Sequence, residues 1–84
     1  MTAALEEMPN TGKVLADRLR RAGIDTPMEL MQLGDAAAFA GIRAELPEDA
    51  CTHTRLALAG AVRGVRWHSL APDLRAELTK ELTR

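Results

Sequence analysis

The sequence of 84 residues is poor in aromatic residues and in cysteine. It has no tyrosine, and its one phenylalanine, one tryptophan and one cysteine are Phe39, Trp67 and Cys51. A lone cysteine cannot form an internal disulfide. With only His53 and His68 as histidines, the chain also cannot supply the roughly four ligands of a structural zinc site. A catalytic thiol would need a base that a third group orients, and no such pattern is present. We therefore expect no disulfide, no metal and no thiol chemistry.

Long apolar runs and an excess of one charge are also missing. No window approaches the roughly 20 apolar residues that a membrane span needs, and the opening residues lack the pattern of a signal peptide. Lysine and arginine total 11 against 12 aspartates and glutamates, so the net charge of −1 shows none of the basic surplus typical of nucleic-acid-binding proteins. We expect a soluble, cytoplasmic protein without a membrane partner, in which any basic surface is local.

The residues that are present favour helices over strands. Hydrophobic residues make up 46% of the chain and charged residues 27%, which is the ordinary range for a folded domain. Alanine and leucine, both strong helix formers, are frequent, and the length suits one domain, residues 1–84. The sequence contains no nucleotide-binding loop and no catalytic triad. We predict an all-α fold, a small bundle of five or six short helices, with no cofactor and no enzyme activity.

Apolar spacing and capping residues place the individual helices. Helical spacing that ends at Gly23 predicts a helix over residues 12–22. A capping box from Thr26 to Glu29 begins a second short helix, which ends at Leu33. Further helices are predicted at residues 35–46, at residues 52–65 and from residue 72 onward.

The helix predicted at residues 52–65 is apolar almost all round, so we expect it at the centre of the bundle. It contains Gly60 and Gly64. Each glycine costs about 1 kcal/mol relative to alanine in a helix interior, so something must require the absence of a side chain. We predict that close packing of a neighbouring helix is that requirement.

Three arginines interrupt the apolar surface of this helix and of the residues just after it. Arg55, Arg63 and Arg66 fall within a stripe roughly 60° wide when about 100° is allowed per residue. The stripe is either the solvent-facing edge of a buried helix or a basic surface that grips a phosphate backbone or an acidic partner. The residue pattern leaves both interpretations open.

A short polar turn, "PNTGK" at residues 9–13, precedes the first predicted helix. Backbone N–H groups at a helix N-terminus attract phosphate, and the helix dipole adds to that attraction. The turn is therefore either a plain connector between two helices or a cradle for a phosphate group.

Several motifs in order resemble the C-terminal domain family of the TfoX competence regulators. They are the run "MPNTGKVLADRLRRAGIDTPMELMQLG" and the later run "LALAGAVRGVRWHSL", so the likeness extends from Met8 to Leu70. Met8 stands where the family has leucine, and the segment from Ala59 to Ala61 has alanine where the family often has glutamate. The resemblance implies an all-helical fold whose N-terminal half is similar to a helix-hairpin-helix module. It also implies a link to the control of DNA uptake, in regulators whose full length includes an N-terminal domain that this sequence lacks.

Two functions are compatible with this resemblance. The first is a regulatory module that binds a protein partner or a second copy of itself. The second is a DNA-binding helix-hairpin-helix without sequence specificity, in which Asn10, Gly12 and Lys13 hold the phosphate. Its basic surface would comprise Arg20, Arg55, Arg63 and Arg66. Residues 1–34 carry four basic and five acidic side chains, so we expect weak DNA binding and favour the first function.

Overall fold

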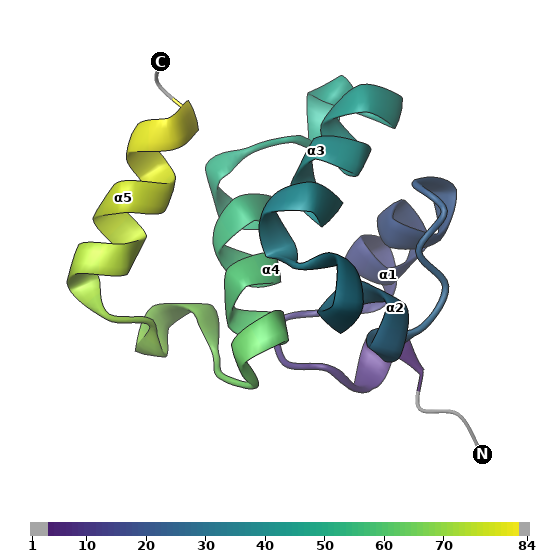
Figure 1. Cartoon of the computed structure of the whole chain (residues 1–84), viewed down its shortest axis with the longest axis horizontal. Helices are drawn as coiled ribbons and strands as arrows, with labels where there is room; N and C mark the ends of the chain where they lie inside the picture. The colour runs from purple at the N-terminus through teal and green to yellow at the C-terminus, as the bar shows by residue number, and fades with distance from the viewer. Residues whose placement is uncertain (1–3, 83–84) are drawn as a thin grey trace.

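The computed structural model describes residues 4–82, and these form an all-α bundle without strands (Figure 1). Five α-helices follow one another as α1 Lys13–Arg21, α2 Pro27–Leu33, α3 Asp35–Glu45, α4 Thr52–Arg63 and α5 Pro72–Leu82. Three short 3-10 helices, η1 Leu5–Glu7, η2 Pro47–Asp49 and η3 Trp67–Ser69, lie between or before them. The predicted fold class is confirmed.

Helix α4 is the central element. It packs against α3 on one side and α5 on the other, while α1 and α2 pack against α3 (Figure 1). Every residue of α4 from Thr54 to Ala61 is buried. The expectation of a central helix that is apolar almost all round is therefore confirmed, because neighbours cover most of its circumference.

The predicted helix ends follow from local hydrogen bonds. At the end of α1, the Ile24 N–H donates to the Leu19 carbonyl oxygen at 2.8 Å, which closes the helix before the chain turns at Gly23. At the start of α2, the Thr26 hydroxyl oxygen accepts the Glu29 backbone N–H at 3.1 Å, as the capping box predicted. These short-range bonds fix the directions of the first two helices.

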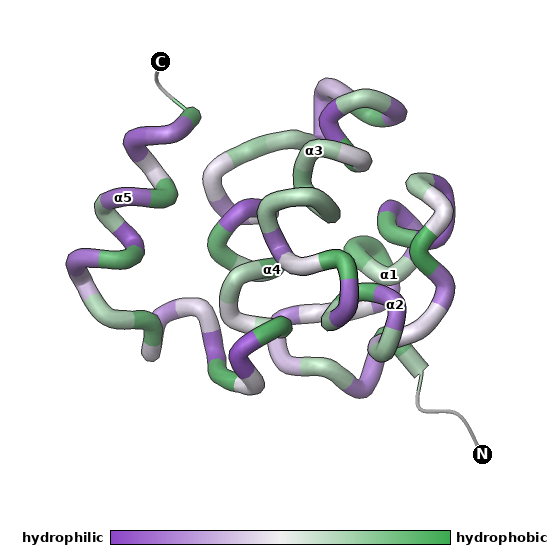
Figure 2. Tube along the Cα trace, in the orientation of Figure 1, coloured by the Kyte–Doolittle hydropathy of each residue, from purple (hydrophilic) through white to green (hydrophobic). Residues whose placement is uncertain are grey.

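Apolar side chains form two clusters, one on each side of α4. The larger joins α1, α2, α3 and α4, and includes Leu5, Leu15, Leu19, Leu30, Phe39, Ile42 and Leu58. The smaller lies between α4 and α5 and comprises Leu56, Ala59, Leu70 and Leu78. Along α5 the hydrophobic and hydrophilic residues alternate in short groups, so this helix turns one apolar face toward α4 (Figure 2).

The C-terminal end of α4 differs from the prediction. The helix stops at Arg63 and does not continue to Val65, because Gly64 adopts the left-handed conformation with φ 72°. The Val65 N–H then donates to the Gly60 carbonyl oxygen at 2.9 Å, and the chain turns toward η3. Gly64 is thus a helix cap, and the prediction that close helix packing requires it is wrong.

Candidate functional site

The side chain of Asn10 fastens the N-terminal turn to the end of α4. Its Nδ2 donates to the Val65 carbonyl oxygen at 2.9 Å and to the Ala57 carbonyl oxygen at 3.3 Å. Its Oδ1 accepts the backbone N–H of Trp67 at 2.9 Å. Asn10 itself has φ 65°, a left-handed conformation that asparagine tolerates better than most residues. Both ends of this amide are therefore occupied within the protein.

Gly60 makes the Asn10 contacts possible. A Cβ atom at this position would lie 2.4 Å from Asn10 Nδ2, 2.6 Å from the Val65 carbonyl oxygen and 3.2 Å from the Trp67 backbone nitrogen. The prediction that a neighbouring helix requires Gly60 is wrong, since the atoms that fill the space belong to a turn and a loop. Sequence periodicity carries no signal for such a contact.

The other two residues of the predicted phosphate turn lie at the start of α1. Gly12 is the residue before the helix, and both Gly12 and Lys13 are exposed. No atom lies within 4 Å of the place where a Gly12 Cβ would be. The residues border a surface hollow of about 320 Å³, to which Arg18 and His53 also contribute. The structure brings Asn10, Gly12 and Lys13 together, while phosphate binding by this turn stays a prediction.

Arg55 does not belong to a basic surface, and this part of the prediction is wrong. The residue is only 4% exposed. Its Nη1 lies 2.5 Å from Asp35 Oδ2, its Nε lies 3.4 Å from Glu81 Oε2, and its guanidinium carbon is 5.9 Å from the centre of the Phe39 ring. Burial alone would raise the pKa of Asp35, but the hydrogen bond and the charge of Arg55 outweigh it and hold that pKa below its ordinary value. Arg55 therefore ties α3 to α4 and α5 from inside the bundle.

The remaining residues of the arginine stripe lie at and after the end of α4. Arg63 is the last residue of the helix, where its Nη1 donates to the Ala59 carbonyl oxygen at 2.9 Å and lies 3.5 Å from Asp35 Oδ1. Arg66 is exposed in the loop before η3. The stripe thus contains one buried, one paired and one exposed cation, and it is a weaker basic surface than the spacing indicated.

Arg20 is also engaged in ion pairs. Its two Nη atoms lie 2.9 and 2.7 Å from the carboxylate oxygens of Glu6, and Nη1 lies 3.5 Å from Asp17 Oδ1. The hydrogen bonds from Arg20 lower the pKa of Glu6 from 4.5 to about 2. Because Glu6 stays ionised at any ordinary pH, Arg20 offers a phosphate little uncompensated charge.

Helix α2 presents an apolar surface that sequence reasoning missed. Met28 is 67% exposed, Met31 58% and Leu33 51%, whereas Leu30 is the one buried residue of this helix. Met28 and Met31 lie three positions apart and so share one face of the helix, and we call this pair the α2 apolar surface. Leu33 faces another side, where it lines a separate hollow with Ile24 and Glu29. The segment "PMELMQL" does indicate exposed apolar side chains, since its four large apolar residues in seven exceed what a short helix buries on one face.

Metal binding and membrane spanning find no support in the described part of the chain. Within residues 4–82 no group of three or more histidine, cysteine, aspartate or glutamate side chains is arranged to hold a metal ion. None of the helices in that range has the length and apolar character needed to cross a membrane.

These features define an all-α domain of five short helices, in which a buried arginine links α3 and α5 to α4 and a turn amide fastens the N-terminal turn to the end of α4. The chain belongs to the TfoX C-terminal domain family, which matches residues 1–82 and confirms the resemblance seen in the motifs.

The chain is similar to the crystal structure of an uncharacterized protein from Listeria monocytogenes in a triclinic form, with 44% identity and a TM-score of 0.88 over 94% of this chain and 89% of that one. It is also similar to a protein of unknown function from Listeria monocytogenes in a tetragonal form. That match has 45% identity and a TM-score of 0.84 over 92% of this chain and 93% of that one. No curated protein matches the chain.

Proposed function

We propose that this protein is a non-enzymatic regulatory module that binds a protein partner, or a second copy of itself, through the α2 apolar surface. The observation that carries the proposal is the exposure of Met28 and Met31 on one face of a helix of seven residues. Neighbouring exposed apolar side chains on a small domain commonly mark an interaction site. The flexible side chains of methionine adapt to a partner. Membership of the TfoX C-terminal domain family supports a regulatory role.

The surface beside Met31 extends this site. A hollow of about 390 Å³ is lined there by apolar residues of the turn after η1 and of the end of α4, among them Met8, Pro9, Ala61 and Val62. Glu7 and Arg63 also line it and add charged groups to an otherwise apolar site. An apolar centre with a polar rim is the usual arrangement of a protein interface.

The double substitution Met28→Ser/Met31→Ser tests this function. We expect it to weaken partner capture or self-association at least about tenfold, because both side chains lose the apolar area that would be buried. Light scattering over a concentration series measures self-association, and quantitative capture of partners by immobilised protein measures hetero-association. The matched control is Val14→Ser, which removes a side chain of similar exposure, 63%, from α1. The proposal fails if the double variant and the control bind alike.

DNA binding is a second candidate, favoured by one observation. The space beside Gly12 is open and Lys13 is exposed, so a phosphate could approach the first turn of α1. Against it, Asn10 uses its amide within the protein, Arg55 is buried and Arg20 is paired with Glu6. Too few cations remain for tight binding to a duplex.

Fluorescence anisotropy with a labelled generic DNA duplex distinguishes the two functions. We expect no binding at roughly 150 mM salt, because a turn with one cation displaces few counterions from the DNA and so gains little affinity. The comparison pair is Lys13→Glu and Arg43→Glu, which make the same charge change on α1 and on the exposed side of α3. Salt-sensitive binding that Lys13→Glu removes and Arg43→Glu leaves would establish DNA as the ligand instead.

A further inference from the structure

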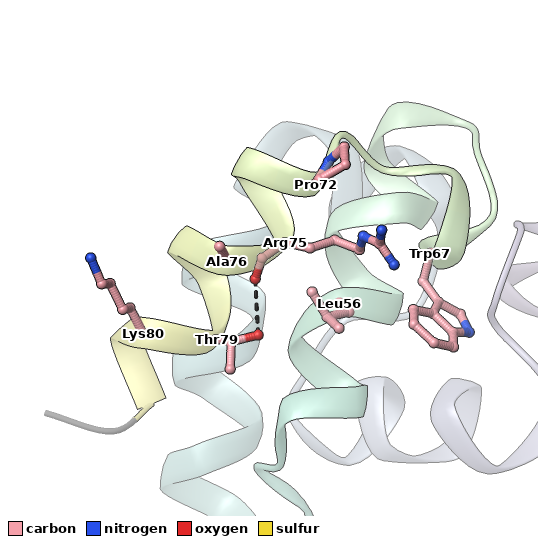
Figure 3. A pocket seen from close by; sticks show the side chains of 7 residues that line it. All are labelled: Leu56, Trp67, Pro72, Arg75, Ala76, Thr79 and Lys80. Atoms are coloured by element: carbon pink, nitrogen blue, oxygen red, sulfur yellow. Dashed lines mark hydrogen bonds between the residues drawn. The ribbon is translucent and has the colours of Figure 1, made fainter.

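A cleft of about 520 Å³ separates α4 from α5 (Figure 3). Leu56 of α4 and Trp67 of η3 form one side of it, and Arg75 and Ala76 of α5 form the other. The indole ring of Trp67 is held edge-to-face by His53 and His68, each with ring centres 5.6 Å apart. The cleft is thus a mostly apolar space with one fixed aromatic wall.

Arg75 is the unusual residue of this cleft. Its side chain leaves α5 and reaches across toward Leu56 and Trp67, as Figure 3 shows. Its Nε is buried, and within residues 4–82 it is the single buried side-chain nitrogen or oxygen that lacks a hydrogen-bond partner. Buried donors ordinarily have acceptors, as Arg55 has in Asp35. Arg75 as a whole is only partly buried, so the cleft is lined by a partly exposed cation whose buried Nε has no acceptor among residues 4–82.

We propose that this cleft binds a small molecule that carries one carboxylate on a short apolar body, such as an aliphatic chain or a single ring. The carboxylate would accept hydrogen bonds from the two Nη atoms of Arg75, because Nε is buried and out of reach of a ligand. The apolar body would lie against Leu56, Trp67 and Ala76. The volume lies within the range of roughly 300 to 1,000 Å³ typical of small-ligand sites.

The lining favours a monocarboxylate over a phosphate or another multiply charged anion. Arg75 and Lys80 are the two basic residues that line the cleft, and the Lys80 ammonium points away from Arg75 in Figure 3, so the two cations do not converge on one anion. The Thr79 hydroxyl donates to the Arg75 carbonyl oxygen at 2.9 Å within α5, so it is already used. One guanidinium matches one negative charge, and the apolar walls match an apolar body.

This site is separate from the α2 apolar surface. Helix α5 lies on the opposite side of α4 from α2 (Figure 1), and the two sets of lining residues share no member. Binding in the cleft can therefore be tested without knowledge of any protein partner.

Trp67 is the only tryptophan of the chain, so its fluorescence reports directly on the cleft. The probes are 4-phenylbutyrate and hexanoate, with 4-phenylbutyramide as the neutral molecule of matched shape. We expect each carboxylate to change the fluorescence saturably at concentrations up to about 10 mM, and the amide to bind at least about tenfold more weakly. Amide chemical shifts of Leu56 and Ala76 in NMR spectra locate the bound probe.

The variant Arg75→Met keeps the apolar stem and removes the charge, and we expect it to weaken carboxylate binding at least about tenfold. Its melting temperature should equal or exceed that of the wild type, because a donor without an acceptor has been removed. Arg43→Met on α3 is the matched control and should bind as the wild type does. No saturable change with either carboxylate, equal binding of the amide, or unchanged binding by Arg75→Met would overturn the proposal.

Discussion

Replacement of Gly60 by alanine is expected to lower the free energy of unfolding by about 2–4 kcal/mol, although alanine is the better helix former. The added Cβ would lie 2.4 Å from Asn10 Nδ2 and 2.6 Å from the Val65 carbonyl oxygen. The carbonyl belongs to the backbone and cannot rotate away, so the loop after α4 or the N-terminal turn must move. That movement breaks the hydrogen bonds of Asn10 and leaves partly buried backbone groups without these partners. Urea denaturation followed by circular dichroism measures the change.

Gly41→Ala provides the matched control, because it makes the same change inside another helix. A Cβ at residue 41 would lie 3.7 Å from the Ala22 Cβ, an ordinary contact distance. We expect this variant to be neutral, or more stable by up to about 1 kcal/mol, because alanine favours the helix. Equal effects of the two substitutions would show that the contact with Asn10 and the loop is not tight.

A double-mutant cycle separates the contribution of Asn10. Asn10→Gly removes the amide and keeps the left-handed conformation without strain. In that background Gly60→Ala should cost less, because the nearest obstacle is gone while the Val65 carbonyl remains. We expect a coupling of about 1–2 kcal/mol between the two positions. Additive effects would mean that the turn and the glycine act independently.

The helices could be predicted because their signals are local. The capping box of Thr26 and Glu29 and the turn at Gly23 each involve residues at most five apart, and the structure contains both. The Asn10 contacts join residues 47 to 57 positions apart and follow no periodicity. For that reason neither the role of Gly60 nor that of Asn10 could be inferred from spacing alone.

The candidate basic surface illustrates a second limit. The contact of Asp17 with Arg20 is one that spacing can reveal, because residues three apart on a helix are neighbours. It could not show that Glu6, 14 residues away, covers the same arginine, or that Asp35, 20 residues away, meets Arg55 inside the bundle. Whether a stripe of cations on one helix forms a basic surface depends on which acidic side chains of other elements lie against it. Packing decides those contacts. The cleft beside Arg75 was missed for the same reason, since it exists only once α5 lies against α4.

Substitution of Arg55 by methionine is expected to destabilise the protein by about 3–5 kcal/mol at neutral pH. Methionine fills much of the volume of the arginine stem, so the loss comes mainly from Asp35, whose side chain is only 15% exposed and would keep only the longer 3.5 Å contact with Arg63. Thermal and urea unfolding measure the loss. The double variant Arg55→Met/Asp35→Asn removes the unpaired charge and should recover more than half of the stability. Failure of the second substitution to restore stability would show that the arginine acts through its packing.

The stability of the wild type should depend on pH more strongly than the stability of Arg55→Met. In the wild type the pKa of Asp35 lies below its ordinary value, so the ion pair stabilises the fold at pH values above the unfolded-state pKa, and acid removes that stability as the pH falls through the folded-state pKa. In Arg55→Met the hydrogen bond and the charge of Arg55 are absent, while the Arg63 charge and a backbone hydrogen bond still favour the ionised carboxylate against burial. The pKa of Asp35 should therefore be depressed less in the variant, and acid should destabilise the variant less than the wild type. The stability difference between wild type and variant should therefore narrow as the pH falls, whereas a constant difference would mean that Asp35 does not sense Arg55.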